Sequence, residues 1–322
     1  MNLRRIGPRG LNLLLILFVY LVIGVLFATR IPAWQIPDEP AHYNYVRQLA
    51  QTGALPVIEP SDWTPGLVPI GPDNRSVAVD RITYEDHQPV LFYALAVPVF
   101  RVFNGNLVAL RLLALAISAV TIVFAFLIVH MLFPAQPGAA AFAAAFVAFL
   151  PQHVHMMAGF NNDALSEALL AATLFVCVQL ILYGVSTRKL IALAIVVGLA
   201  LLTKAQAYLA LPLAVIGLWM AYQPRTWRMI AAPALACLMA APLWVRNIAT
   251  YGRFDFLGLQ EHNLVVVGQP TTAMLIAKLG LGGMLFKLLR TTFQSFWGQF
   301  GWMSITLSDR FYLGFPCRLR GN

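Results

Sequence analysis

Two carboxylates and one imidazole, Asp38, Glu39 and His42, lie within five positions of one another just after the first hydrophobic segment of the chain. A carboxylate can accept the proton of a hydroxyl group that lies within hydrogen-bonding distance. The alternative is structural, because acidic residues are favoured at helix N-termini and a helix is expected to begin near Ala41. The position beside a hydrophobic segment favours Asp38 and Glu39 as a catalytic pair, with His42 as a substrate-binding residue.

Other polar residues border or interrupt later apolar stretches. His87 and Gln88 close a polar loop, where the alternative is an ordinary loop boundary. Asp163 opens a long apolar run, where it could serve only as a helix N-cap. Lys204 interrupts an apolar stretch, where it could simply extend its amine to the surface, or it could face a phosphate. Arg246, near a later polar loop, could share that phosphate contact.

The composition identifies an integral membrane protein. Hydrophobic residues make up 60% of the 322 positions and charged residues only 11%, against about 25% in an ordinary soluble domain. The formal net charge of +9 comes mainly from Lys and Arg beside apolar segments, where they set orientation and contact anionic lipid. We therefore expect membrane lipid as a partner and no nucleic acid.

The first apolar segment, 11–29, follows three arginines and predicts an uncleaved membrane anchor with a cytoplasmic N-terminus. A signal peptide is the alternative, but no Ala-x-Ala type cleavage site is found. The loop at 32–106 is then external, and it is acidic: eight of the thirteen Asp and Glu residues lie between positions 38 and 86. The apolar stretch 89–100 is too short to cross and predicts a juxtamembrane helix within this loop.

The remaining apolar runs predict six further spans. They cover 107–132, 139–158, 164–185, 190–203, 206–222 and 229–245. The stretch 271–290 either crosses once more or lies in the interface. The sequence thus predicts an all-α polytopic membrane protein, in the inner (plasma) membrane, with about seven to eight transmembrane helices, forming a single domain over 1–322. With this topology every candidate site residue falls on the external side.

Metal binding has weak support in the sequence. His42 and His87, with carboxylates nearby, are the best candidates for a divalent cation, but no His-Glu-x-x-His spacing is present. Cys177, Cys237 and Cys317 are isolated, which argues against a disulfide framework and a cysteine-based zinc site. No metal ligands and no certain cofactor are assigned, and a divalent metal stays an open alternative.

Five segments together resemble the C-type membrane glycosyltransferases, in the bacterial branch related to protein mannosyltransferases and the lipid A aminoarabinose transferase. These segments are Pro37-Asp38-Glu39-Pro40-Ala41-His42, Gln88-Pro89, Asn162-Asp163, Leu202-Thr203-Lys204, and residues 295–303. The family usually has a double proline where this chain has Gln88-Pro89. Its members continue through further spans, so we expect the C-terminal end to be truncated, which would remove part of the pocket.

The resemblance implies transfer of a sugar from a polyprenyl-phosphate donor to an acceptor hydroxyl, by a single displacement at the anomeric carbon. By position it implies that Asp38 is the general base, with Glu39 as the nearest rival. It also implies that Asp163 shapes the donor or metal site and that Lys204 meets the lipid phosphate. The acceptor is not predicted. The alternative is a non-catalytic transporter or flippase component, which would place its polar groups in broken helices near the middle of the membrane.

Overall fold

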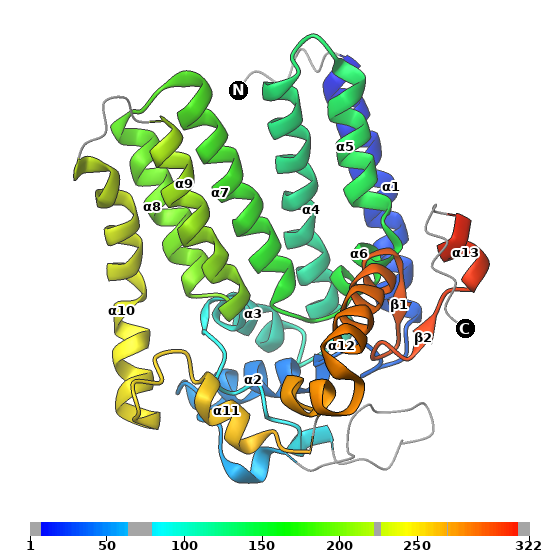
Figure 1. Cartoon of the computed structure of the whole chain (residues 1–322), viewed down its shortest axis with the longest axis vertical. Helices are drawn as coiled ribbons and strands as arrows, with labels where there is room; N and C mark the ends of the chain where they lie inside the picture. Colours follow the sequence, from blue (N-terminus) through cyan, green and yellow to red (C-terminus); the bar gives the residue numbers. More distant parts are fainter. Residues whose placement is uncertain (1–7, 64–78, 222–226, 269, 315–322) are drawn as a thin grey trace.

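Helices form a long bundle, and shorter helices form a layer across one of its ends (Figure 1). A computed structural model of the chain describes residues 8–63, 79–221, 227–268 and 270–314. The α-helices are α1 (Pro8–Arg30), α2 (Glu39–Thr52), α3 (Leu91–Val102), α4 (Leu107–Leu132), α5 (Pro137–Phe149), α6 (Pro151–Met157), α7 (Asp163–Tyr183), α8 (Thr187–Leu201), α9 (Ala210–Ala221), α10 (Ala231–Tyr251), α11 (Leu259–Val265), α12 (Thr272–Trp297) and α13 (Asp309–Gly314). The 3-10 helices are η2 (Pro60–Asp62), η3 (Val79–Arg81), η4 (Ala205–Leu209) and η5 (Trp227–Ile230). Strands β1 (Gln299–Phe300) and β2 (Ile305–Thr306) pair antiparallel.

Small residues allow the bundle helices to approach one another closely. On α5, the fully buried residues Ala140, Ala144 and Ala148 recur every four positions and pack with residues of α1 and α4. A second stripe, Ala236 and Ala240, does the same on α10 against α8. Where the surroundings are as apolar as the side chains themselves, close packing of small residues is a main source of helix association.

The fold class predicted from the sequence is confirmed. Among the described residues, α1, α4, α7, α10 and α12 are long and apolar enough to cross a membrane, and α5 with α6 makes a sixth candidate if the bent pair is one span. Helices occupy all seven ranges that were expected to cross before residue 246, although α8 and α9 are shorter, at 15 and 12 residues. The count of seven to eight spans stays a prediction.

The range 139–158, predicted as one span, contains a break that the sequence analysis did not predict. The chain bends by 59° between α5 and α6. Pro151 is the cause, because proline has no N–H to donate and forces the preceding residue out of the helical region. Leu150 accordingly has extended backbone angles, φ −66° and ψ 118°. The bend turns α6 across the end of the bundle, where it contacts α1 and α7.

The stretch whose course the sequence left open forms α12, which is longer than the apolar run itself. It contains a break at Gly280, with φ +70° and ψ 168°, that favours glycine. None of its residues is buried. Some sequence predictions involve Arg4, Arg5, Asp73 and Cys317, which lie outside the described residues.

Stacked aromatic rings attach the layer at the end of the bundle. Tyr45 of α2 stacks on Tyr93 of α3 with ring centroids 3.7 Å apart and an interplanar angle of 13°. Phe92 of α3 lies against Phe160, which precedes α7. At 12 residues α3 is too short to cross, as predicted, and it packs against α2 and α4. This packing sets where the start of α2 lies relative to the start of α7.

Candidate active site

Four segments that are distant in the sequence meet at this end of the bundle. The backbone N–H of Leu91 donates to Leu202 O over 2.9 Å, which joins the start of α3 to the end of α8. The side-chain amide of Asn162 lies 3.3 Å from Gln88 Oε1 and 3.3 Å from Thr203 O. The fourth segment is the start of α2, which contributes polar residues to the same region. The structure thus places the segments that carry Asp38, His87, Asp163 and Lys204 in one region.

Asp38 stands at the N-cap of α2 in a left-handed conformation, φ 62° and ψ −2°. Asp adopts this conformation more readily than most residues, and strained backbone is common at functional sites. Its Oδ1 accepts a hydrogen bond from the Tyr84 hydroxyl at 2.6 Å. Burial, followed by the negative charge of Glu85, raises the pKa of Asp38 to about 6, against the lowering effects of the Tyr84 hydrogen bond and the nearby Lys204 ammonium.

Asp163 and Lys204 form an ion pair at the edge of the same group. Lys204 Nζ donates to Asp163 Oδ1 at 2.6 Å, and the lysine is only 8% exposed. Asp163 is the first residue of α7, where the helix dipole favours a negative charge. Lys204 lies in extended backbone between α8 and η4. An ammonium has three N–H donors and this contact uses one of them.

Two imidazoles of the site, those of His42 and His87, have lowered pKa values. His42 Nδ1 lies 2.7 Å from the Tyr93 hydroxyl, and burial, then the charge of Lys204, holds the pKa of His42 well below its usual value. Burial, then the neighbouring His262, lowers the pKa of His87 to about 3. The rings of His87 and His262 are 4.5 Å apart. Both site histidines are therefore suited to hydrogen bonding with a polar ligand and not to carrying charge.

Gln88 and Glu85 complete the floor of the site. Gln88 Nε2 donates to Glu85 Oε2 at 2.7 Å, and both residues are at least 90% buried. Burial raises the pKa of Glu85, against the lowering effect of the Lys204 charge. Asp38, Glu85, Asp163 and Lys204 influence one another electrostatically, so they form a single charged group, here called the reaction cluster.

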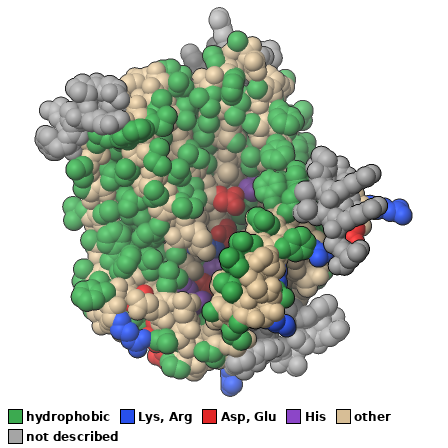
Figure 2. All heavy atoms as spheres, in the orientation of Figure 1, with side chains coloured by type: hydrophobic (Ala, Val, Ile, Leu, Met, Phe, Trp, Pro, Cys, Tyr) green, Lys and Arg blue, Asp and Glu red, His purple; other side chains and the backbone are tan. Residues whose placement is uncertain are grey.

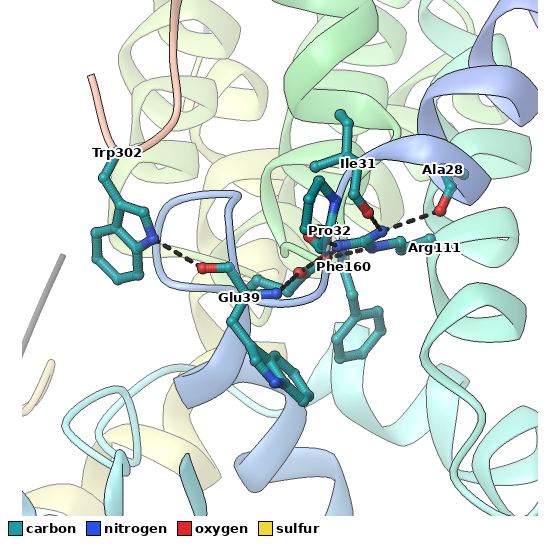
Figure 3. A network of polar contacts seen from close by, with 8 residues as sticks. Ala28, Ile31, Pro32, Glu39, Arg111, Phe160 and Trp302 are labelled. Carbon is teal, nitrogen blue, oxygen red and sulfur yellow. Dashed lines mark hydrogen bonds and ion pairs between the residues drawn. The ribbon is translucent and has the colours of Figure 1, made fainter. Parts of the chain in front are cut away.

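Glu39 has a different environment from its neighbour Asp38 (Figure 3). The Arg111 guanidinium donates to both oxygens of Glu39, at 2.7 and 2.6 Å. The backbone N–H groups of Trp34 and Phe160 donate to the same two oxygens. Glu39 is 0% exposed and Arg111 is 2% exposed. The carboxylate of Glu39 is thus fully engaged within the protein.

The Arg111 side chain also caps the C-terminal end of α1. Its guanidinium donates to the carbonyl oxygens of Ala28, Ile31 and Pro32 at 2.8 to 3.1 Å. Carbonyl groups at a helix C-terminus have no partner within the helix, and these contacts supply partners. Arg111 therefore connects the end of α1 to α4 and, through Glu39, to α2.

Arg246 has its contacts outside the reaction cluster. It lies in the second-last turn of α10, and its guanidinium donates to Pro56 O at 2.6 Å and Leu55 O at 3.3 Å. It also donates to Asn247 Oδ1 at 3.0 Å and lies over the ring of Tyr251. These contacts attach residues 55 and 56 of the loop between α1 and α4 to the end of α10.

Sequence reasoning missed four residues of this region, Tyr84, Glu85, Arg111 and His262, as site members. Arg111 had a usable signal, because an arginine one turn inside an otherwise uncharged span needs a partner. Glu85 belongs to a polar stretch that was recognised, but Tyr84 and His262 carry no local signal. Among the residues that the structure describes, no group of three or more His, Cys, Asp and Glu side chains is arranged to hold a metal ion.

The surface of the molecule is hollowed near this end of the bundle. Figure 2 shows a hollow in which acidic and histidine side chains lie. The part of this face above the hollow is largely hydrophobic. An amphipathic ligand with an apolar tail and a polar head matches such a surface, because the tail can stay along the apolar flank while the head enters the hollow.

Comparison with known families gives the class of protein, a membrane glycosyltransferase of the C type. The chain belongs to the family described as dolichyl-phosphate-mannose-protein mannosyltransferase, which it matches over residues 86–246. Glycosyltransferases of this family use lipid-linked sugar donors, and membership of the family indicates a glycosyltransferase. The matched range includes Asp163 and Lys204. A search of curated proteins found no match.

Proposed function

We propose that this protein transfers a hexose or pentose from a polyprenyl-phosphate donor to an acceptor hydroxyl at the external face of the membrane. Asp38 is the general base in this proposal. The observation that carries it is the reaction cluster, which places a partly exposed carboxylate of raised pKa in the same charged group as a buried ammonium. These two groups match the two charge changes of the reaction.

The first charge change is at the acceptor. Asp38 takes the proton of the acceptor hydroxyl while that oxygen forms a bond to the anomeric carbon. A general base works best when its pKa lies near the working pH, and the pKa of Asp38, about 6, meets this condition. The Tyr84 hydroxyl holds the carboxylate in one orientation.

The second charge change is at the donor. As the bond between the anomeric carbon and the phosphate oxygen breaks, its electron pair leaves with the lipid phosphate, and negative charge grows there. Lys204 is the cation proposed to receive it, since Asp163 holds one side of the ammonium and two N–H donors are left for phosphate oxygens. Displacement in one step inverts the anomeric configuration.

His42, His87 and Gln88 are proposed to bind the sugar, because they are buried in the same region and present neutral hydrogen-bonding groups. Arg246 is proposed to act indirectly, by holding residues 55 and 56 of the external loop. Glu39 is not proposed as the base, because its oxygens already accept four hydrogen bonds and it is 0% exposed.

The test compares Asp38→Asn with Glu39→Gln in membranes supplied with radiolabelled polyprenyl-phosphate sugars. We expect Asp38→Asn to accumulate normally and to lose about 10²–10⁴-fold in transfer rate, the usual contribution of a general base. We expect Glu39→Gln to lower the amount of folded protein, with the activity per folded molecule less affected. Equal transfer by wild type and Asp38→Asn would remove Asp38 as the base.

The proposed orientation, with a cytoplasmic N-terminus, has its own test. Single cysteines replace Ala54, in the external loop, and Arg188, in the first turn of α8. The 21 residues of α7 separate these ends by about 30 Å. A membrane-impermeant thiol reagent added to intact cells should label position 54 and spare position 188. Labelling of position 188 alone would reverse the orientation.

A further inference from the structure

The aromatic segment 295–303 has no part in the reaction as proposed above. Its last residues belong to the hairpin of β1 and β2, which contacts α6 and α12 (Figure 1). The backbone N–H of Gln299 donates to Gln152 Oε1 of α6 at 2.7 Å. The ring of Phe300 lies edge-on to His155 of α6, with ring centroids 5.0 Å apart. The hairpin is therefore attached to the end of the bundle that carries the reaction cluster.

Trp302, in the turn of this hairpin, reaches the segment that joins α1 to α2. Its indole Nε1–H donates to the backbone carbonyl oxygen of Trp34 at 2.9 Å, across 268 positions of sequence. Figure 3 shows the Trp302 indole directed toward this segment. Trp34 in turn donates its backbone N–H to Glu39 Oε2 at 3.0 Å. A contact from the C-terminal part of the chain thus acts on the backbone that leads into Asp38.

The backbone at both ends of this contact is unusual. The φ angle is 69° at Trp34 and 54° at Trp302, and four residues after Trp34 it is 62° at Asp38. Bulky residues rarely adopt this left-handed region, and they keep it only where the surrounding structure imposes it. The indole hydrogen bond contributes to that constraint, because it fixes the direction of the Trp34 carbonyl group.

The side chain of Trp34 connects the same segment to the partner of Asp38. Trp34 packs against a buried cluster that contains Tyr84, and the Tyr84 hydroxyl donates to Asp38 Oδ1. A displacement of Trp34 would therefore disturb two things at once. They are the backbone that leads into Asp38 and the ring that orients its carboxylate.

We propose that Trp302 is a positioning residue for Asp38. It holds the segment 34–38 in the conformation that directs the Asp38 carboxylate at the acceptor hydroxyl, and it acts through Trp34. This role rests on the proposed function, in which Asp38 is the base. Asp163 and Lys204, on the donor side, belong to α7 and to the connection after α8. Loss of the Trp302 contact should therefore affect transfer more than donor binding.

The test removes the indole N–H with Trp302→Phe in the full chain, in membranes supplied with a radiolabelled polyprenyl-phosphate sugar. Misplacement of a catalytic group by 1 Å can cost about 100-fold, so kcat should fall about 10- to 100-fold while KM for the donor changes less than about threefold. Trp244→Phe is the matched control, because it removes the indole N–H that donates to the Tyr208 hydroxyl at 2.6 Å. It should keep the wild-type kcat.

Hydrogen exchange gives a measurement that does not depend on transfer. In the purified protein in detergent, deuterium uptake by a peptide covering 31–42 should increase in Trp302→Phe and stay at the wild-type level in Trp244→Phe. Gln152→Leu removes the acceptor of the Gln299 N–H and should also lower kcat, whereas Gln152→Glu keeps an acceptor oxygen and should restore it. If Trp302→Phe does not accumulate, equal kcat in the two Gln152 variants overturns the proposal.

Three results with a folded Trp302→Phe variant would also overturn the positioning role. They are a wild-type kcat, a loss confined to KM for the donor, and unchanged exchange over 31–42. Asp38→Asn separates this failure from failure of the proposed function. Full transfer by Asp38→Asn removes the base itself, whereas an inactive Asp38→Asn beside a fully active Trp302→Phe removes only the positioning role.

Discussion

The pKa of Asp38, about 6, makes a quantitative prediction for the pH dependence of transfer. The base must be ionised, so kcat/KM rises with pH and reaches a plateau above pH 7. At pH 5 roughly one carboxylate in eleven is ionised if the pKa is 6, whereas more than about nine in ten would be ionised at the ordinary aspartate value. The rate at pH 5 should therefore be about tenfold below the plateau.

The assay is the initial rate of transfer from a radiolabelled polyprenyl-phosphate sugar, at low donor concentration, from pH 4.5 to 8. Glu85→Gln tests the cause of the shift. The negative charge of Glu85 raises the pKa of Asp38, so its removal should move the midpoint to lower pH and increase the relative rate at pH 5. Asp309→Asn, which alters an exposed acid of α13, is the control and should leave the midpoint in place.

Two outcomes would refute this reasoning. A wild-type midpoint near pH 4 would show that Asp38 is not perturbed by its surroundings. An unchanged acidic limb in the residual activity of Asp38→Asn would show that another group titrates.

Three further predictions concern the pairs of charges and the buried acid. Arg111→Leu leaves the Glu39 carboxylate buried without its partner, so unfolding in detergent should become easier by about 3–5 kcal/mol; the double change Glu39→Leu with Arg111→Leu should recover part of the loss, and equal melting temperatures for single and double variants would contradict this. Lys204→Met should reduce kcat/KM for the lipid-phosphate donor about 10²–10³-fold, with partial recovery in Lys204→Arg; an unaltered value would argue against phosphate contact. Burial raises the pKa of Asp86 to about 8, although the hydrogen bond from Gln48 acts to lower it. The native state then holds a proton between pH 4 and 8 that the unfolded state lacks, so stability falls as pH rises towards 8. Asp86→Asn should reduce the drop in melting temperature between pH 6 and pH 8, and an equal drop in both proteins would refute it.

The helices of the bundle could be predicted from the sequence because the thickness of a bilayer sets the length of an apolar run. The range 107–132 matches α4 residue for residue. The bend at Pro151 was also available from the sequence, since proline disfavours helix both at its own position and before it. It was missed because the apolar run continues through it.

The partners of the polar residues were harder to predict. Glu39 and Arg111 are 72 positions apart, and the local sequence around each residue does not indicate the other as its partner. The different surroundings of Asp38 and Glu39 likewise depend on a single left-handed residue at the start of α2. The sequence shows that Asp38 and Glu39 are acidic and follow the first apolar segment, but which of the two carboxylates is buried depends on the tertiary fold.

The contacts of Arg111 also constrain the order in which the protein can assemble in the membrane. This one guanidinium touches the exit of α1, resides on α4, and holds a carboxylate that in turn binds the backbone at Phe160. The amino-terminal part of the loop between α1 and α4 therefore cannot reach its final arrangement until α4 to α6 have been synthesised and inserted. Assembly of this end of the bundle is expected to be a late event, even though its first acidic residues are among the earliest to leave the ribosome.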